Sequence, residues 1–192
     1  MTDSDTSDAP HRVFRLHRTV VLVGMMGSGK TAIGRALAAR LGVDYVDSDE
    51  EIETAANATI AEIFERSGEA FFRDREAEVI ARLLMAAPCV LSTGGGAYLA
   101  ARNRDAISQN GVAVLLDADL DLLWERVRHK DTRPLLRTPD PKATLTALFD
   151  ARAPIYALAD LKAKADPAFS IDEMTDEVVQ VLLTRPDVLE TE

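Results

Sequence analysis

The feature that most constrains the fold is the segment Gly24–Thr31, GMMGSGKT, which matches the pattern G-x-x-x-x-G-K-[ST] without a gap. It follows an apolar run at 19–23 that is typical of a strand buried on both faces. The helical spacing of Ile33, Leu37 and Leu41 comes directly after it. A strand, a glycine-rich turn and a helix form the context in which this motif cradles nucleotide phosphates. The alternative is a glycine turn that matches the pattern by chance and binds no phosphate. That alternative does not explain why a predicted strand precedes the turn and a predicted helix follows it.

Each residue type in this motif has a physical role in binding phosphate. Glycines let backbone N–H groups turn inward, and the following helix adds the positive end of its dipole. Lys30 is expected to reach the β- and γ-phosphates, and the hydroxyl of Thr31 is expected to bind Mg²⁺. The chain has no N-K-x-D tetrapeptide of the guanine-binding type, which favours ATP. The residues predicted to hold the ATP phosphates are Gly27, Ser28, Gly29, Lys30, Thr31 and Ala32.

Short apolar runs alternate with amphipathic segments along the rest of the chain. Strands are predicted at 19–23, 44–47, 89–91, 112–116 and 161–165. Helices are predicted after the glycine turn, from a capping box at Thr59, over 72–84 and at 175–183. This alternation implies right-handed crossovers, and therefore an α/β fold with a five-stranded parallel sheet covered by helices on both faces. Ligands in such sheets bind beyond the carboxyl ends of the strands.

Composition narrows the class of partner. The 192 residues include 22 basic and 32 acidic ones, and the net charge of −10 argues against binding a nucleic-acid backbone. The single cysteine, Cys89, rules out an internal disulfide and a cysteine-based zinc site. No apolar run is long enough to span a membrane, and the acidic N-terminus lacks the apolar core of a signal peptide. We therefore expect a cytoplasmic protein.

The two ends of the chain differ from the rest. Residues 1–17 are polar and acidic and are predicted to form a disordered tail, and residues 185–192 are predicted to form a frayed C-terminus. No repeat and no linker rich in glycine, serine or proline divides the chain between them. Residues 18–184 are therefore predicted to form a single domain.

A pair of carboxylates, Asp47 and Asp49, stands at the end of the second predicted strand. Residues two apart on an extended segment point the same way, so both carboxylates would face the phosphate cradle across the crevice. There they could serve Mg²⁺ and a substrate hydroxyl separately. A solvated acidic loop leading into Glu50 and Glu51 explains the same spacing equally well.

Three arginines lie next to sequences that suggest a binding site. Arg73 follows two phenylalanines, Arg133 stands in a polar stretch without periodicity, as a mobile lid would, and Arg152 precedes Ala153-Pro154-Ile155-Tyr156. The guanidinium group is suited to forked recognition of a carboxylate or a phosphate. Taken singly, however, each arginine is more typical of a solvated surface.

Six motifs together identify a family resemblance. They are Gly24 to Thr31, Asp47-Ser48-Asp49, Phe72-Arg73 with Glu76, Leu91-Ser92-Thr93-Gly94-Gly95-Gly96, Thr132-Arg133-Pro134-Leu135-Leu136 and Arg152 to Tyr156. In this order and at this spacing, the chain closely resembles a shikimate kinase over about residues 19–184. The resemblance implies the nucleoside monophosphate kinase type of P-loop fold, with a lid. It also implies a monomer that phosphorylates the 3-hydroxyl of shikimate with ATP and Mg²⁺.

The resemblance also implies roles on the substrate side. Asp49 is similar to the family's aspartate that binds the ring hydroxyls and orients or deprotonates the attacking one. Arg73 and Arg152 are similar to the pair that grips the shikimate carboxylate, and Glu76 would hold Arg73 from the adjacent helical turn. The residues implied to bind shikimate are Asp49, Arg73, Gly94, Gly95, Gly96 and Arg152.

On the nucleotide side, Arg133 resembles the lid arginine that contacts the transferring phosphoryl group. Asp47 and Thr31 would manage the metal, because Ser92 stands near the place where many P-loop proteins carry an aspartate. One segment departs from the family: after the fifth strand, residues 165–170 read ADPAFS rather than an Asx/Arg-rich stretch that lines the adenine. Arg126 is then a candidate for stacking on the base.

Two other functions compete with this interpretation. Another small-molecule kinase of the same fold, such as a gluconate kinase, also takes a polyhydroxy acid, but Arg73, the three glycines and Arg152 favour a cyclic carboxylate. A nucleotide-switched binding module without an acceptor would not need Asp49 beside a carboxylate clamp.

Overall fold

The computed structural model describes residues 13–129 and 134–192. Its centre is a parallel sheet of five strands in the order β3-β4-β2-β5-β6, so the strand that precedes the glycine loop lies in the middle. The strands are β2 (Thr19–Val23), β3 (Tyr45–Asp47), β4 (Val90–Ser92), β5 (Gly111–Asp117) and β6 (Leu161–Lys164). The predicted five-stranded parallel sheet is confirmed.

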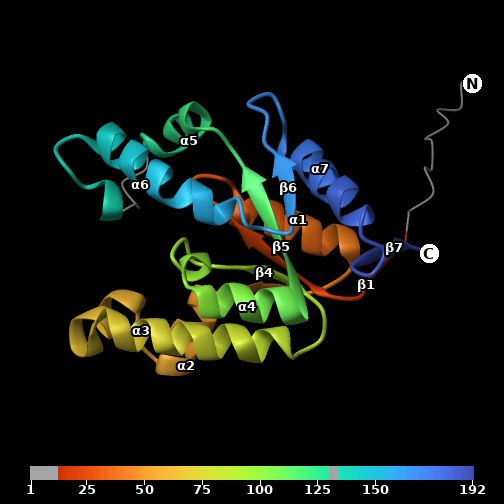
Figure 1. The fold of residues 1–192 in the computed structure, drawn as a ribbon, viewed down its shortest axis with the longest axis horizontal. Coiled ribbons are helices and arrows are strands. Elements are labelled where there is room, and N and C mark those ends of the chain that lie inside the picture. Colours follow the sequence, from red (N-terminus) through yellow and green to blue (C-terminus); the bar gives the residue numbers. More distant parts are fainter. Residues whose placement is uncertain (1–12, 130–133) are drawn as a thin grey trace, which may run out of the picture.

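Helices cover both faces of this sheet (Figure 1). They are α1 (Lys30–Leu41), α2 (Ser48–Ala56), α3 (Ile60–Leu84), α4 (Ala101–Asn110), α5 (Leu120–Val127), α6 (Pro141–Tyr156) and α7 (Ile171–Leu183), with short 3₁₀ helices η1 (Ala97–Leu99) and η2 (Pro134–Leu136). Helices α1 and α7 pack together on one side, whereas α3 and α4 lie side by side on the other. Within the described part of the chain, no helix combines the length and the apolar character needed to cross a membrane.

Local signals explain several helix boundaries. The capping box predicted at Thr59 is formed with Glu62, and α3 is interrupted at Gly68, whose φ of 79° breaks the helical conformation between the two predicted segments. Helix α7 begins four residues before the predicted position, because Ser170 and Glu173 form a second capping box there. Helix α1 ends at Gly42, with φ 67°, as predicted.

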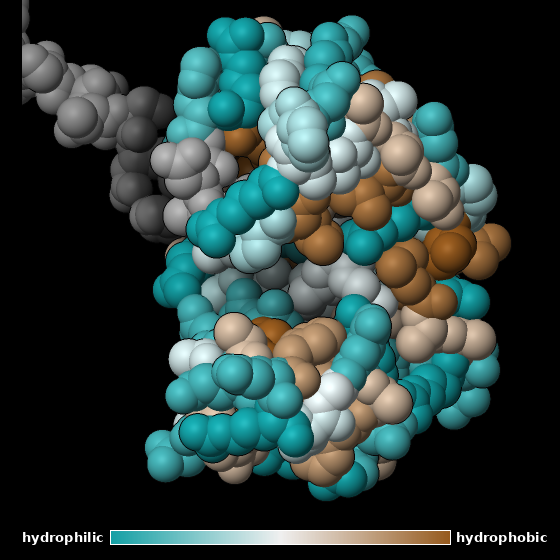
Figure 2. All heavy atoms as spheres, turned by 90° about the vertical axis from the view of Figure 1, so that its left-hand side faces the viewer, coloured by the Kyte–Doolittle hydropathy of each residue, from teal (hydrophilic) through white to brown (hydrophobic). Residues whose placement is uncertain are grey.

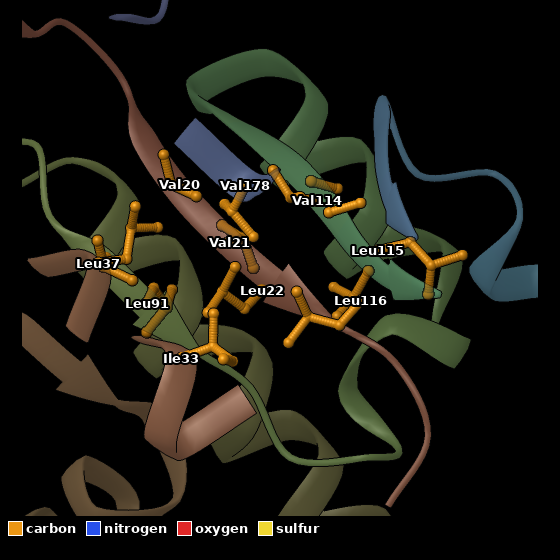
Figure 3. Close-up of a cluster of buried hydrophobic side chains, with 14 of the residues drawn as sticks. Val20, Val21, Leu22, Ile33, Leu37, Leu91, Val114, Leu115, Leu116 and Val178 are labelled. Carbon is orange, nitrogen blue, oxygen red and sulfur yellow. The ribbon is translucent and has the colours of Figure 1, made fainter. Parts of the chain in front are cut away.

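The core lies where the central strands meet α1 and α7 (Figure 3). Val20, Val21 and Leu22 of β2 are fully buried, because this strand has a neighbour on each side and a helix layer on each face. A second small cluster, formed by Ile52, Ile63 and Phe72, fixes α2 against α3. The rigid sheet and this cluster together hold the loops at the carboxyl ends of the strands.

The prediction for the chain ends is wrong for residues 14–17 and 185–192, whereas residues 1–12 lie outside the described part. Residues 14–16 form β1 (Phe14–Leu16), which pairs antiparallel with β7 (Leu189–Thr191). Leu189 is buried, and Leu16 packs against the core. Each segment is too short to show periodicity alone, and its partner is far away in the sequence, so local reasoning missed the pairing.

Candidate functional site

The phosphate loop connects β2 to α1 at the carboxyl end of the central strand. Gly29, the residue before α1, has φ 98°, a left-handed conformation that a side chain would strain. Gly27 has φ 83°, and a β-carbon there would also lie 2.7 Å from Cγ1 of Val127 in α5. The glycines therefore allow a loop whose backbone turns sharply and lies directly against a neighbouring helix.

Two polar side chains of this loop can bind an anion. Nζ of Lys30 donates to the carbonyl oxygens of Gly24 at 2.8 Å and Met25 at 3.2 Å, which folds the side chain back over the loop. The Ser28 hydroxyl is buried and has no hydrogen-bond partner among the described residues. A buried hydroxyl without a partner is costly unless a ligand satisfies it, and a phosphate oxygen at this loop would do so.

Asp47 and Asp49 stand at the junction of β3 and α2. Asp47 caps the helix, because its Oδ1 accepts a hydrogen bond of 2.9 Å from the backbone N–H of Asp49. The pKa of Asp49 is raised to about 6, chiefly by burial and also by the nearby carboxylates of Asp47, Glu76 and Glu53, against the opposing charge of Arg73. A carboxyl group with this pKa is still mostly ionised at neutral pH and is a better proton acceptor than an ordinary aspartate.

One cavity of about 490 Å³ joins these two parts of the site. Its lining includes the phosphate loop, both carboxylates and the start of the glycine segment after β4. Figure 2 shows that the surface formed by the left side of Figure 1 is hollowed between two largely hydrophilic parts. A solvated acidic loop would point away from the phosphate cradle, whereas Asp47 and Asp49 share a cavity with it.

The cavity contains hard oxygen donors for a metal. Asp47 is in register with Ser92 of β4, and both line the cavity together with Thr31. The described residues contain no group of three or more His, Cys, Asp or Glu side chains that could hold a metal by themselves. Mg²⁺ typically takes one or two protein oxygens, water and substrate phosphates, so this donor set fits Mg²⁺ bound together with a nucleotide.

The glycine segment after β4 brings three functional side chains together. A β-carbon on Gly94 would lie 2.7 Å from Oδ1 of Asp49, and one on Gly96 would lie 2.5 Å from Nη2 of Arg73. A β-carbon on Gly95 would lie 3.7 Å from Nη1 of Arg152. Asp49 comes from α2, Arg73 from α3 and Arg152 from α6. The segment is therefore the point where an acidic group and two guanidinium groups converge.

Arg73 is fixed by a buried carboxylate. Its Nη1 donates to both oxygens of Glu76, at 3.0 and 2.9 Å, and Glu76 is only 1% exposed. Burial raises the pKa of Glu76, whereas the hydrogen bond and charge of Arg73 lower it. The other side of the guanidinium faces Gly96, and its Nε lies 3.5 Å from Oε1 of Glu69. The prediction that Glu76 holds Arg73 is confirmed.

Comparison with known proteins agrees with this geometry. The family model described as shikimate kinase matches residues 26–183. The chain belongs to the shikimate kinase family. A shikimate kinase of Ruegeria pomeroyi is 68% identical over 175 residues, covering 91% of this chain and 90% of that protein. One of Cereibacter sphaeroides is 61% identical, covering 93% and 89%. The structure of a shikimate kinase from Acinetobacter baumannii in complex with shikimate is 38% identical, with a TM-score of 0.79 over 87% of this chain and 93% of that one.

Of the two arginines expected on the nucleotide side of a shikimate kinase, Arg126 lies in the described part of the chain and Arg133 does not. Nη1 of Arg126 in α5 donates weakly to the carbonyl oxygens of Gly27 and Ser28, both at 3.4 Å, and the side chain lines the cavity. Stacking of Arg126 on a base stays a prediction. Arg133 lies outside the described residues, so its predicted lid role also stays a prediction.

Sequence reasoning missed several residues of this shikimate kinase site. Three apolar side chains line the cavity at and just before the start of α7: Phe169, Ile171 and Met174. The region after β6, where the sequence differs from the family pattern, therefore contributes an apolar wall. Tyr45 donates a 3.4 Å hydrogen bond to Oδ2 of Asp47, and its pKa is raised chiefly by burial. The only available signal for Tyr45 was its position two residues before Asp47, which places both on one face of β3.

Proposed function

We propose that this protein transfers the γ-phosphoryl group of ATP to the 3-hydroxyl of shikimate, giving shikimate 3-phosphate and ADP. The observation that carries the proposal is the convergence of Asp49, Arg73 and Arg152 on the glycine segment, beside the phosphate loop. A cyclic acid with several hydroxyls needs a cationic clamp for its carboxylate and an acceptor for one hydroxyl proton. The match to the shikimate kinase family and the relatives that bear this name support the same substrate.

On the acceptor side, the chain's own residues supply binding and proton transfer. Arg73 and Arg152 hold the carboxylate of shikimate, which orients the ring over the glycine segment. Asp49 accepts a hydrogen bond from the attacking hydroxyl and takes up its proton as the new O–P bond forms. The raised pKa of Asp49, about 6, suits this role because it lies closer to the pKa of the attacking hydroxyl than the pKa of an ordinary aspartate does.

On the donor side, charge neutralisation dominates. The loop N–H groups and Lys30 hold the β- and γ-phosphates. To do so, Lys30 exchanges its carbonyl partners for phosphate oxygens, and it stabilises the negative charge that develops between the two phosphates during transfer. Thr31 and Asp47 would hold Mg²⁺, which supplies further neutralisation of the phosphates when it is bound. We assign Arg133 to the transferring phosphoryl group. Arg126 and the apolar side chain of Phe169 at the cavity wall are assigned to the adenine.

A coupled ADP-release assay with shikimate, with gluconate and without acceptor tests the proposal. We expect rapid ADP release only with shikimate. ADP release that is stimulated by gluconate but not by shikimate would indicate that the substrate is an open-chain polyhydroxy acid instead. Release that no acceptor accelerates would indicate a nucleotide-driven binding module.

The remaining assignments concern the state of the protein in the cell. We propose a monomer in the cytoplasm that binds neither nucleic acid nor membrane. The net charge of −10 disfavours contact with a phosphate backbone or an anionic lipid surface. Size-exclusion chromatography with light scattering tests the oligomeric state, and a dimer mass near twice 20.9 kDa would contradict it.

A further inference from the structure

Tyr156 is the last residue of α6, one helical turn after Arg152. Its side chain is 3% exposed, and its hydroxyl donates a hydrogen bond to the carbonyl oxygen of Gly95. A β-carbon on Gly95 would lie 3.9 Å from that hydroxyl and 3.7 Å from Nη1 of Arg152. The hydroxyl of Tyr156 and the guanidinium of Arg152 therefore face the same point of the glycine segment.

The Arg152 guanidinium also acts on this hydroxyl. Burial raises the pKa of Tyr156, whereas the charge of Arg152 and a hydrogen bond with it lower that pKa. The phenol thus donates to Gly95 while it lies in the field of the Arg152 guanidinium, and both groups face the same glycine, which makes Tyr156 a bridge between helix and loop. An apolar residue of the same shape would fill the core equally well and would make neither contact.

The ring of Tyr156 is fixed on its other side. It stacks on Tyr98, with 6.4 Å between ring centroids and 14° between planes. Tyr98 belongs to η1, which directly follows the glycine segment, and Arg104 donates to the carbonyl oxygens of Tyr98 and Leu99 at 2.8 and 2.7 Å. The backbone N–H groups of Ala97 and Leu99 in η1 donate to the carbonyl oxygens of Gly94 and Gly96. The Tyr156 hydroxyl holds the carbonyl oxygen of Gly95, the residue between them.

The position of Gly95 matters for both of its neighbours. Gly94 lies against Asp49 and Gly96 lies against Arg73, each so closely that a β-carbon would not fit. A rotation of the Gly95 peptide would therefore change the spacing of all three side chains that converge there. A displacement of about 1 Å is enough to weaken binding strongly at such a site.

We propose that Tyr156 is a positioning residue that joins Arg152 to the glycine segment and so sets the geometry in which the carboxylate of the acceptor is bound. This inference rests on the proposed function for the identity of the acceptor. It assigns a role to a residue that is not among those lining the cavity.

The Tyr156→Phe variant tests the proposal. It keeps the ring and its stack on Tyr98 but leaves a partly buried carbonyl without its donor. We expect the KM for shikimate to rise about tenfold, the KM for ATP to stay within about twofold and the melting temperature to fall by a few degrees, because the carbonyl loses its donor. Tyr98→Phe is the matched control: it removes the other hydroxyl of the stack, for which the described residues provide no hydrogen bond, and it should leave both KM values unchanged.

Coupling to Arg152 is measured by a double-mutant cycle. If Tyr156 acts through Arg152, adding Tyr156→Phe to Arg152→Lys should raise the shikimate KM by clearly less than tenfold. Equal rises in both KM values, or multiplicative effects of the two substitutions, would overturn the proposal in favour of a merely structural tyrosine.

Amide hydrogen exchange gives a readout that is independent of the substrate. We expect several-fold faster exchange at 94–99 in Tyr156→Phe, with no change in Tyr98→Phe. Unchanged exchange in Tyr156→Phe would overturn the positioning role even in an active enzyme. A wild-type protein without shikimate-dependent ADP release would instead reject the proposed function, and the exchange result would still decide what Tyr156 does.

Discussion

Two loops of this protein contain three glycines each, but glycine is needed in them for different physical reasons. In the phosphate loop, Gly24, Gly27 and Gly29 have φ values of 146°, 83° and 98°, so the backbone itself requires glycine. In the segment after β4, Gly94, Gly95 and Gly96 have no such φ values. Here a β-carbon on Gly94 or Gly96 would collide with a side chain from α2 or α3, whereas one on Gly95 would only touch side chains of α6.

This difference separates a locally specified site from an assembled one. The phosphate loop is built from one continuous segment whose conformation and N–H groups are set by its own residues. The proposed acceptor site exists only when three helices bring Asp49, Arg73 and Arg152 to the same segment. The first should tolerate changes elsewhere in the fold, whereas the second should respond to any change in helix placement.

The largest effect is expected from Lys30→Met in the phosphate loop. It removes a cation that stabilises charge developing on the phosphates, so kcat should fall by about 10²–10⁴-fold. The melting temperature should change little, because the loop conformation is set by its glycines. Steady-state kinetics on the folded variant test this, and near wild-type turnover would show that the loop does not carry the phosphoryl chemistry.

Asp49→Asn probes the carboxylate that faces the glycine segment. It keeps the shape but removes the basicity, so kcat should fall by about 10²-fold with a smaller change in the shikimate KM. In the wild type, kcat/KM for shikimate should rise with pH and bend near 6, the pKa of Asp49. A profile that stays flat between pH 5 and 8 would contradict a role for its ionised form.

The same substitution has a consequence for stability with a definite sign. The pKa of Asp49 is higher in the folded protein, about 6, than the ordinary value of 3.8, so wild-type stability falls as pH rises through this interval. Above pH 6, Asp49→Asn should be more stable than the wild type by about 1–2 kcal/mol, allowing for partial solvent exposure. The gain should vanish towards pH 4, and thermal melts across this range measure it.

Arg152→Ala should act on binding rather than turnover. Loss of one arm of the carboxylate clamp should raise the shikimate KM by roughly tenfold to 150-fold, while the ATP KM stays near normal. Arg152→Lys should recover only part of this, since an ammonium group cannot reproduce the fork. An effect on ATP alone would move Arg152 to the nucleotide side of the site.

Alanine at one glycine of each loop tests the comparison directly. Gly96→Ala should raise the shikimate KM by about tenfold or more, because the new β-carbon displaces the Arg73 guanidinium. Gly29→Ala meets no side chain closer than 3.5 Å but is strained at φ 98°, so it should raise the ATP KM and lower stability by about 1–2 kcal/mol. If both variants impair the same substrate, the two loops do not differ as described.

The smallest effect on catalysis is expected from deleting residues 1–17. The deletion removes β1 and leaves Leu189 and the edge of β7 uncovered, so the melting temperature should fall by about 5 °C. Both KM values and kcat should stay within about twofold, because these strands lie away from the cavity. An unchanged melting temperature would show that β1 contributes no stability.

The sequence by itself determined the features that depend on neighbouring residues. The strand, glycine turn and helix around Lys30 and the capping box at Thr59 follow from local spacing, whereas the pair of Arg73 and Glu76 was implied by the family resemblance. The parallel sheet followed from alternation of apolar runs with helices. Recognition of the acceptor motifs came from their order and spacing in a known family and not from the chemistry of single residues.

Only the tertiary structure decided features that join residues far apart in the chain. It paired β1 with β7, placed Phe169 at the cavity wall and brought the Tyr156 hydroxyl to Gly95, 61 residues away. It also showed why Gly94 and Gly96 are glycines, because the atoms that exclude a β-carbon come from two separate helices. Local propensity contains no term for such contacts, which exist only after the core has fixed the helices on the sheet.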